Sequence, residues 1–180
     1  MKYFIGITPP KETAQKIASF QKEFKNNKLP GMFEPHITIK TKNGLTEDLS
    51  WIEKVRPVIE SYHKFEVSFT GVDTFRDEVV ILRIEPSKEL VGLHKELFRT
   101  ISPDETDTSR KYFENDRFEP HLTLGMSSWG MNKEELVVMK EAAEKEFPAI
   151  PKFEVPFVRI YRQKELDELY EEFLDIPLNE

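Results

Sequence analysis

A short segment occurs twice in this chain, once in each half, and it constrains the fold more than any other feature. Residues 33–39 read FEPHITI and residues 118–124 read FEPHLTL. Around both copies, the spacing of apolar residues predicts the same order of elements: strand, helix, motif strand, helix, strand. Duplication of a whole structural unit explains this pattern better than chance recurrence of a short string. The sequence therefore predicts two related halves.

A chain of 180 residues without a Gly- or Ser-rich linker fits a single domain. We predict an α+β fold with two pseudo-symmetric lobes, about residues 1–76 and 77–180. Each lobe is expected to hold an antiparallel sheet flanked by outer helices, with a central cleft between the lobes. Twofold pseudo-symmetry then places the two motifs face to face.

Individual elements follow from the apolar periodicity and from turn and capping residues. Strands are expected at 3–7, 65–75, 79–84 and 153–161, with the motif strands beginning at His36 and His121. A tight turn is expected at Arg76-Asp77, and residues 170–178 are expected to form an edge strand or a covering tail. Helices are expected after Thr8, after Thr46, along the apolar stripe 90–101, and after the Asn132/Glu135 capping box.

Composition narrows the classes of function. The chain has no cysteine, which removes disulfides and thiolate chemistry and suits a reducing compartment, so a cytoplasmic protein is expected. Neither a signal peptide nor a membrane-spanning segment is recognisable, and no membrane partner is expected. A net charge of −7 argues against broad binding to long nucleic acid and favours a small or terminal substrate.

Alternation along a strand places His36 and Thr38 on one face, and His121 and Thr123 on the matching face of the second motif. Two histidines can supply the base and the acid for displacement at phosphorus, because their usual pKa of about 6.5 lets one be neutral while the other is protonated. The threonine hydroxyls can donate hydrogen bonds to the non-bridging oxygens. We predict His36 and His121 as catalytic, Thr38 and Thr123 as phosphate-binding, and no metal or cofactor.

The paired His-x-Thr motifs, one in each half of a chain of this length, resemble those of the 2H phosphoesterase superfamily. That group includes bacterial 2'-5' RNA ligase-like proteins and 2',3'-cyclic phosphodiesterases. The resemblance implies acid and base roles for His36 and His121, and phosphate binding by Thr38 and Thr123. Residues 117–125 are especially close to the family pattern, whereas Lys40 and Thr41 depart from it after the first motif.

The resemblance implies a phosphoesterase that acts on RNA-type 2',3'-cyclic phosphates or 2'-5' linkages, with RNA ends, short oligonucleotides or cyclic nucleotides as substrates. A monomer is expected, because the duplication already supplies both half-sites. One alternative is a phosphodiesterase for a small cyclic nucleotide such as an ADP-ribose cyclic phosphate. Two others are a non-catalytic module that binds RNA ends and a purely structural duplicated domain.

Several further residues have plainer interpretations. Glu34 and Glu119 are interpreted as solvated rather than catalytic, and His63 and His94 as structural or solvated. Residues 102–117 are either a substrate-facing loop, with Arg110, Lys111 and Tyr112 as contacts, or a plain surface loop. Arg159 and Tyr161 share one strand face, but the pattern does not decide whether that face lines the cleft.

Overall fold

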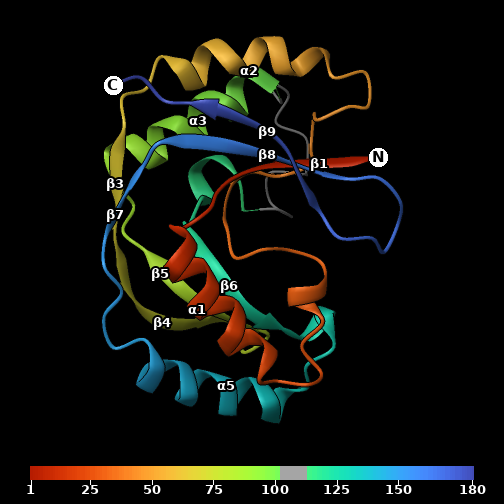
Figure 1. Cartoon of the computed structure of the whole chain (residues 1–180), viewed down its shortest axis with the longest axis vertical. Helices are drawn as coiled ribbons and strands as arrows, with labels where there is room; N and C mark the ends of the chain where they lie inside the picture. The colour runs from red at the N-terminus through yellow and green to blue at the C-terminus, as the bar shows by residue number, and fades with distance from the viewer. Residues whose placement is uncertain (102–112) are drawn as a thin grey trace.

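The computed structural model describes residues 1–101 and 113–180 and has an α+β architecture (Figure 1), as predicted. In chain order its elements are β1 (Lys2–Ile7), α1 (Lys11–Lys22), η1 (Leu29–Gly31), β2 (Ile37–Lys40), α2 (Ser50–Glu60), β3 (Phe65–Val67), β4 (Phe69–Phe75), β5 (Val79–Ile84), α3 (Lys88–Ile101), η2 (Asn115–Arg117), β6 (His121–Met126), η3 (Ser127–Trp129), α5 (Lys133–Glu146), β7 (Phe153–Val155), β8 (Phe157–Gln163) and β9 (Glu171–Pro177).

The main sheet has seven strands in the order β4-β5-β6-β2-β1-β8-β9, and neighbouring strands run antiparallel. The motif strands β2 and β6 lie side by side at its centre. Their register contains one Cα pair, Ile37 with Leu122. The sheet therefore has two parts, β4-β5-β6 and β2-β1-β8-β9, which meet at the two motifs.

Each part of the sheet contains strands from both halves of the sequence. Arg76 and Asp77 form the predicted tight turn, with φ values of 50° and 55°, and this turn joins β4 to β5. Because so short a turn connects antiparallel neighbours, β4 of the first half pairs with β5 of the second. At the other side, β8 of the second half pairs with β1 of the first. The predicted division near residue 76 therefore does not coincide with a division in space.

The helices also combine the two halves (Figure 1). Helices α1 and α5 pack against the β4-β5-β6 part, while α2 and α3 pack against each other and contact β9 and β2. Buried apolar side chains from the sheet and all four helices form a continuous core, which includes Ile17, Val55, Leu93 and Met139.

Two predicted strands are interrupted. The segment 65–75 breaks at Ser68 and the segment 153–161 breaks before β8, at Pro156, which has no N–H to continue a ladder. The short pieces on the N-terminal side of these breaks, β3 and β7, pair with each other as a separate two-stranded sheet. Residues 171–177 form the predicted edge strand β9.

The predicted helix starts are correct for α5 and differ for two other helices. Asn132 and Glu135 form the capping box of α5. Helix α1 begins after Pro10, and the Thr8 hydroxyl instead donates to main-chain carbonyl oxygens. Helix α2 begins at Ser50, whose N–H donates to Asp48, so Thr46 is not its cap.

Two buried side-chain amides, one in the last turn of α1 and one in the segment that follows α1, contact the motif strand β6. Gln21 Nε2 donates to the carbonyl of Thr123 at 3.0 Å, and Asn27 Nδ2 donates to the carbonyl of Leu124 at 2.9 Å. A buried main-chain carbonyl needs a hydrogen-bond donor. The two amides supply donors to β6 where this strand diverges from β2. The amides therefore help to fix the geometry at the junction of the two sheet parts.

Candidate active site

Three of the four predicted site residues lie on the two central strands, and the fourth directly precedes one of them. His121 and Thr123 belong to β6, Thr38 belongs to β2, and His36 stands immediately before β2. Ile37, Ile39, Leu122 and Leu124 are buried, whereas the histidines and threonines are partly exposed. The predicted alternation between a core face and a polar face is confirmed.

Both imidazoles are held in the same way. His36 Nδ1 lies 2.8 Å from the main-chain oxygen of Glu34, and His121 Nδ1 lies 2.7 Å from that of Glu119. Because a carbonyl oxygen only accepts, Nδ1 must carry the hydrogen in each ring. Nε2 is then the nitrogen through which either ring can accept or donate a proton.

Burial favours the neutral form of both imidazoles in the free protein. Burial lowers the pKa of His36 from 6.5 to about 4, opposed by its hydrogen bond to the Glu34 carbonyl and by the Glu34 carboxylate. The charge of His121 contributes to the same lowering, so the two rings interact electrostatically. Burial also lowers the pKa of His121, opposed by the Glu119 carbonyl and carboxylate. A bound phosphate would favour the protonated form of either ring.

Two cavities meet at the threonines. One, of about 310 Å³, is lined by His121, and the other, of about 370 Å³, is lined by His36. Both cavities share Thr38, Thr41, Thr123 and Met126 in their walls. A group held by the two threonines would therefore have one histidine and one cavity on each side.

Aromatic rings line both cavities. On the His36 side, Phe33 stacks on Tyr170 at 4.8 Å between ring centroids and meets Trp129 edge-on at 5.6 Å. On the His121 side, Phe75 lies parallel to the partly exposed Phe113, with centroids 6.1 Å apart. Such surfaces suit the flat faces of nucleobases.

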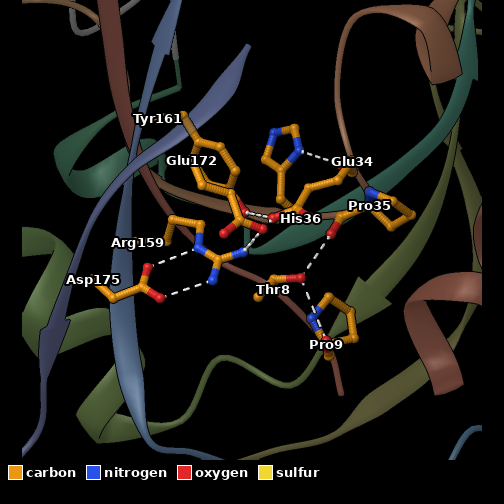
Figure 2. Close-up of polar contacts among 9 residues, drawn as sticks. All are labelled: Thr8, Pro9, Glu34, Pro35, His36, Arg159, Tyr161, Glu172 and Asp175. Carbon is orange, nitrogen blue, oxygen red and sulfur yellow. Dashed lines mark hydrogen bonds and ion pairs between the residues drawn. The ribbon is translucent and has the colours of Figure 1, made fainter. Parts of the chain in front are cut away.

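Glu34 is only partly exposed and its carboxylate has partners, contrary to the sequence-based interpretation of a solvated glutamate. Its carboxylate accepts hydrogen bonds from the Tyr161 hydroxyl at 2.6 Å and from Arg159 Nη1 at 3.0 Å (Figure 2). Arg159 also pairs with Asp175 and Glu172 on β9. Burial and the Glu34 carboxylate raise the pKa of the Tyr161 phenol, which therefore stays a donor. No local sequence pattern predicts this cluster, because Glu34 and Arg159 are 125 residues apart in the sequence.

Glu119 is more exposed than Glu34 but also has a partner, since Arg83 Nη1 lies 3.2 Å from its carboxylate. Of the other histidines, His63 is exposed and bonded to the main chain of Glu180. His94 is buried, with Nδ1 on the Ile39 carbonyl and Nε2 accepting the Asn115 N–H. Its ring nitrogens are both satisfied, as a structural histidine requires.

Lys40 forms a buried ion pair that the sequence did not reveal. Its Nζ lies 2.7 Å from Glu114, and neither side chain is appreciably exposed. Burial lowers the pKa of Lys40, and the Glu114 carboxylate opposes that shift. The pair ties the end of β2 to the segment that leads into β6. Arg110, Lys111 and Tyr112 lie outside the described residues.

Within residues 1–101 and 113–180, no three His, Cys, Asp or Glu side chains are grouped to hold a metal ion. Metal independence stays a prediction. In that same described part of the chain, the helices are too short or too polar to cross a membrane.

The fold and this arrangement define a class: α+β proteins that bring two His-x-Thr motifs together on adjacent central strands. The chain belongs to the 2'-5' RNA ligase superfamily, whose family model matches residues 8–165. The resemblance to the 2H phosphoesterases is therefore confirmed.

Solved structures show the same fold. TT0787 of Thermus thermophilus superposes with a TM-score of 0.67 at 14% identity, covering 98% of this chain and 97% of that one. E. coli LigT complexed with NADP+ gives 0.63 at 16% identity, covering 99% and 98%. Usb1 of Kluyveromyces marxianus gives 0.50 at 12% identity, covering 98% and 97%. No curated protein matches the sequence.

Proposed function

We propose that this protein is a metal-independent phosphoesterase that acts on RNA-type 2',3'-cyclic phosphates or 2'-5' phosphodiester linkages. The observation that carries the proposal is the matched pair of histidines, each held at Nδ1 by a carbonyl, on either side of Thr38 and Thr123. One Nε2 takes a proton from the attacking water or hydroxyl, and the other donates a proton to the leaving oxygen. The threonine hydroxyls bind the non-bridging oxygens.

Substrate binding and protonation are coupled in this scheme. Burial lowers the pKa of both imidazoles in the free protein, which disfavours the protonated form that the acid needs. The negative charge of a phosphate beside the ring favours the imidazolium form. A single chain supplies both histidines, so the enzyme acts as a monomer.

The cavities support a nucleotide substrate. Phosphate at the threonines would have an aromatic-lined cavity on each side, which fits a diester that joins two nucleosides. E. coli LigT has been crystallised with phosphate and with 3'-AMP. Both ester oxygens of a cyclic phosphate belong to one sugar, so a mononucleoside cyclic phosphate or an ADP-ribose cyclic phosphate would extend from the threonines into one of the two cavities.

The test compares a nucleoside 2',3'-cyclic phosphate, a 2'-5' dinucleotide and an ADP-ribose cyclic phosphate in excess EDTA, with products identified by phosphorus NMR. The wild type should turn over at least one of them, and His36→Ala and His121→Ala should each lower the rate at least about a hundredfold. Equal turnover by the wild type and both variants, or activity abolished by EDTA, would overturn the proposal.

The threonines give a second prediction. Thr38→Ala and Thr123→Ala should each lower kcat/KM by about 10- to 100-fold, because a hydrogen bond to a charged group contributes about 1.5–3 kcal/mol. Thr38→Ser and Thr123→Ser keep the hydroxyl and should retain most activity. Tight binding of a 3'-phosphorylated oligonucleotide that no form cleaves, with affinity lost in both alanine variants, would instead identify a binding module.

A further inference from the structure

The glutamate two residues before each histidine has two roles in the structure. The main-chain oxygen of Glu34 accepts the hydrogen of His36 Nδ1, while its carboxylate is held by Tyr161 and Arg159 (Figure 2). Arg159 is held in turn by Asp175, through contacts of 2.7 Å and 2.8 Å. An unbroken set of contacts therefore leads from the edge strand β9 through β8 to the imidazole.

The second motif repeats this arrangement with different strands. Glu119 offers its main-chain oxygen to His121 Nδ1, and its carboxylate contacts Arg83 Nη1 at 3.2 Å. Arg83 Nε is bonded to Asp73 on β4 at 2.6 Å. An aspartate, an arginine and a glutamate thus stand behind each histidine. Packing alone does not require the same three residue types twice.

We propose that Glu34 and Glu119 are positioning residues, which fix the direction of each histidine through their own main-chain carbonyls. The effect on turnover rests on the proposed function, whereas the effect on the imidazole does not. An imidazole can rotate about its side-chain bonds, and here the Nδ1 contact to the carbonyl limits that rotation. Anchoring the carboxylate fixes the residue that carries this carbonyl, so the direction of Nε2 is fixed within the cavity that each histidine shares with the threonines.

Other contacts limit the movement of the first motif. The Thr8 hydroxyl lies 3.4 Å from the carbonyl oxygen of Pro35, between Glu34 and His36. The Pro35 ring restricts the backbone at the same point. The carboxylate also contributes charge, since it favours the protonated form of His36. Replacing Glu34 by Gln and by Ala separates the effect of charge from that of position.

The two clusters differ in exposure. The side chains of Glu34 and Arg159 are 33% and 10% exposed, whereas those of Glu119 and Arg83 are 54% and 39% exposed. Solvent weakens an exposed ion pair and salt screens it further. Glu34 therefore restrains His36 more strongly than Glu119 restrains His121.

The experiment measures the imidazole tautomers and pKa values by ¹H–¹⁵N NMR of the free protein, alongside kcat and KM. In Glu34→Ala, we expect a larger share of the Nε2-protonated tautomer of His36, and a kcat lowered about 10- to 100-fold with KM nearly unchanged. Glu34→Gln should keep the tautomer and lower the pKa of His36. Glu119→Ala should have a smaller effect on His121.

Two further variants test whether a change at His36 comes from the loss of the Glu34 carboxylate or from a general disruption of the structure. Tyr161→Phe removes one hydrogen bond to Glu34 while keeping the ring, and should shift the His36 tautomer less than Glu34→Ala does. Glu171→Gln removes the negative charge that pairs with Arg162 and Lys164, between the same two strands, and should leave His36 unchanged.

A Glu34→Ala protein with the wild-type tautomer, imidazole pKa and kcat would overturn the positioning role. So would a tautomer change of equal size in Glu171→Gln. If the wild type cleaves none of the substrates, the proposed function fails, but the NMR spectra of the free protein still decide the role of Glu34.

Discussion

His36 and His121 have the same sequence neighbours but different surroundings. The His36 ring lies among Phe4, Phe33 and Tyr161, with centroids 4.7, 5.6 and 5.7 Å away. The His121 ring lies nearly perpendicular to the Phe75 ring, with the two centroids 4.9 Å apart. An apolar surrounding disfavours the imidazolium ion, so protonation of His36 should oppose folding.

The lowered pKa of His36 predicts how the free energy of unfolding depends on pH. The pKa of His36 is about 4 in the folded protein and about 6.5 when unfolded, so between these values the unfolded chain binds more protons. The free energy of unfolding should therefore fall as the pH is lowered from about 6.5 towards 4. In His36→Gln this fall should be smaller, as measured by urea unfolding at several pH values. Parallel curves for the two proteins would contradict the prediction.

At the residue scale, local pattern predicted the four site residues but not the side chains that support them. Alternation along a strand is a local property, so the shared faces of His36 with Thr38 and of His121 with Thr123 could be inferred. Glu34 and Lys40 have partners 125 and 74 residues away, which no local pattern identifies. For this reason Glu34 was wrongly interpreted as solvated.

At the scale of elements, the site depends on the divergence of β2 and β6. Past the Ile37–Leu122 pair, main-chain carbonyls of β6 have side-chain partners from α1 and from the segment that follows it. The buried Asn27 side chain makes three main-chain contacts, one of them with β6: it donates to the carbonyls of Leu124 and Gln21 and accepts from the N–H of Leu29.

Asn27→Ala should therefore destabilise the protein by about 1–3 kcal/mol, since it leaves buried main-chain groups without partners. The neighbouring Asn26 is exposed and contacts Glu135, so Asn26→Ala should cost less than about 0.5 kcal/mol. Urea unfolding of both variants measures the difference. Similar losses in the two would show that Asn27 does not secure β6.

Element positions could be predicted better than element ends. Apolar periodicity located the strands and the helices, and the Asn132/Glu135 pair located the start of α5. The breaks at Ser68 and Pro156 depend on β3 and β7 pairing with each other. That pairing joins segments far apart in the chain, and only the proline at one break was visible in advance.

At the scale of the whole molecule, the repeat predicted pseudo-symmetry but not the exchange of strands. A repeat shows that two halves are alike, and it does not say which strands pair. The sequence did contain one relevant signal, the tight turn at Arg76-Asp77. Such a turn makes β4 and β5 neighbours, and pseudo-symmetry then makes β8 and β1 neighbours.

This exchange means that neither half of the sequence is a folding unit. Residues 1–76 alone would lack β5, the one partner of β4, and β8, one of the two neighbours of β1. Residues 77–180 alone would lack β4 beside β5 and β1 beside β8. Each half would also lose the two helices of the other half, which exposes apolar core surface. We predict that each fragment alone is largely unfolded.

Mixing the two fragments should restore the fold, because the cut falls in a turn and removes no strand pairing. Folding becomes bimolecular, so recovery should rise with fragment concentration, as followed by circular dichroism and NMR. The matched control is the full chain with a protease site inserted between Arg76 and Asp77, which should stay folded after cleavage. A dispersed NMR spectrum from residues 77–180 alone would show instead that the second half is an independent lobe, and that the exchange of strands is not needed for its stability.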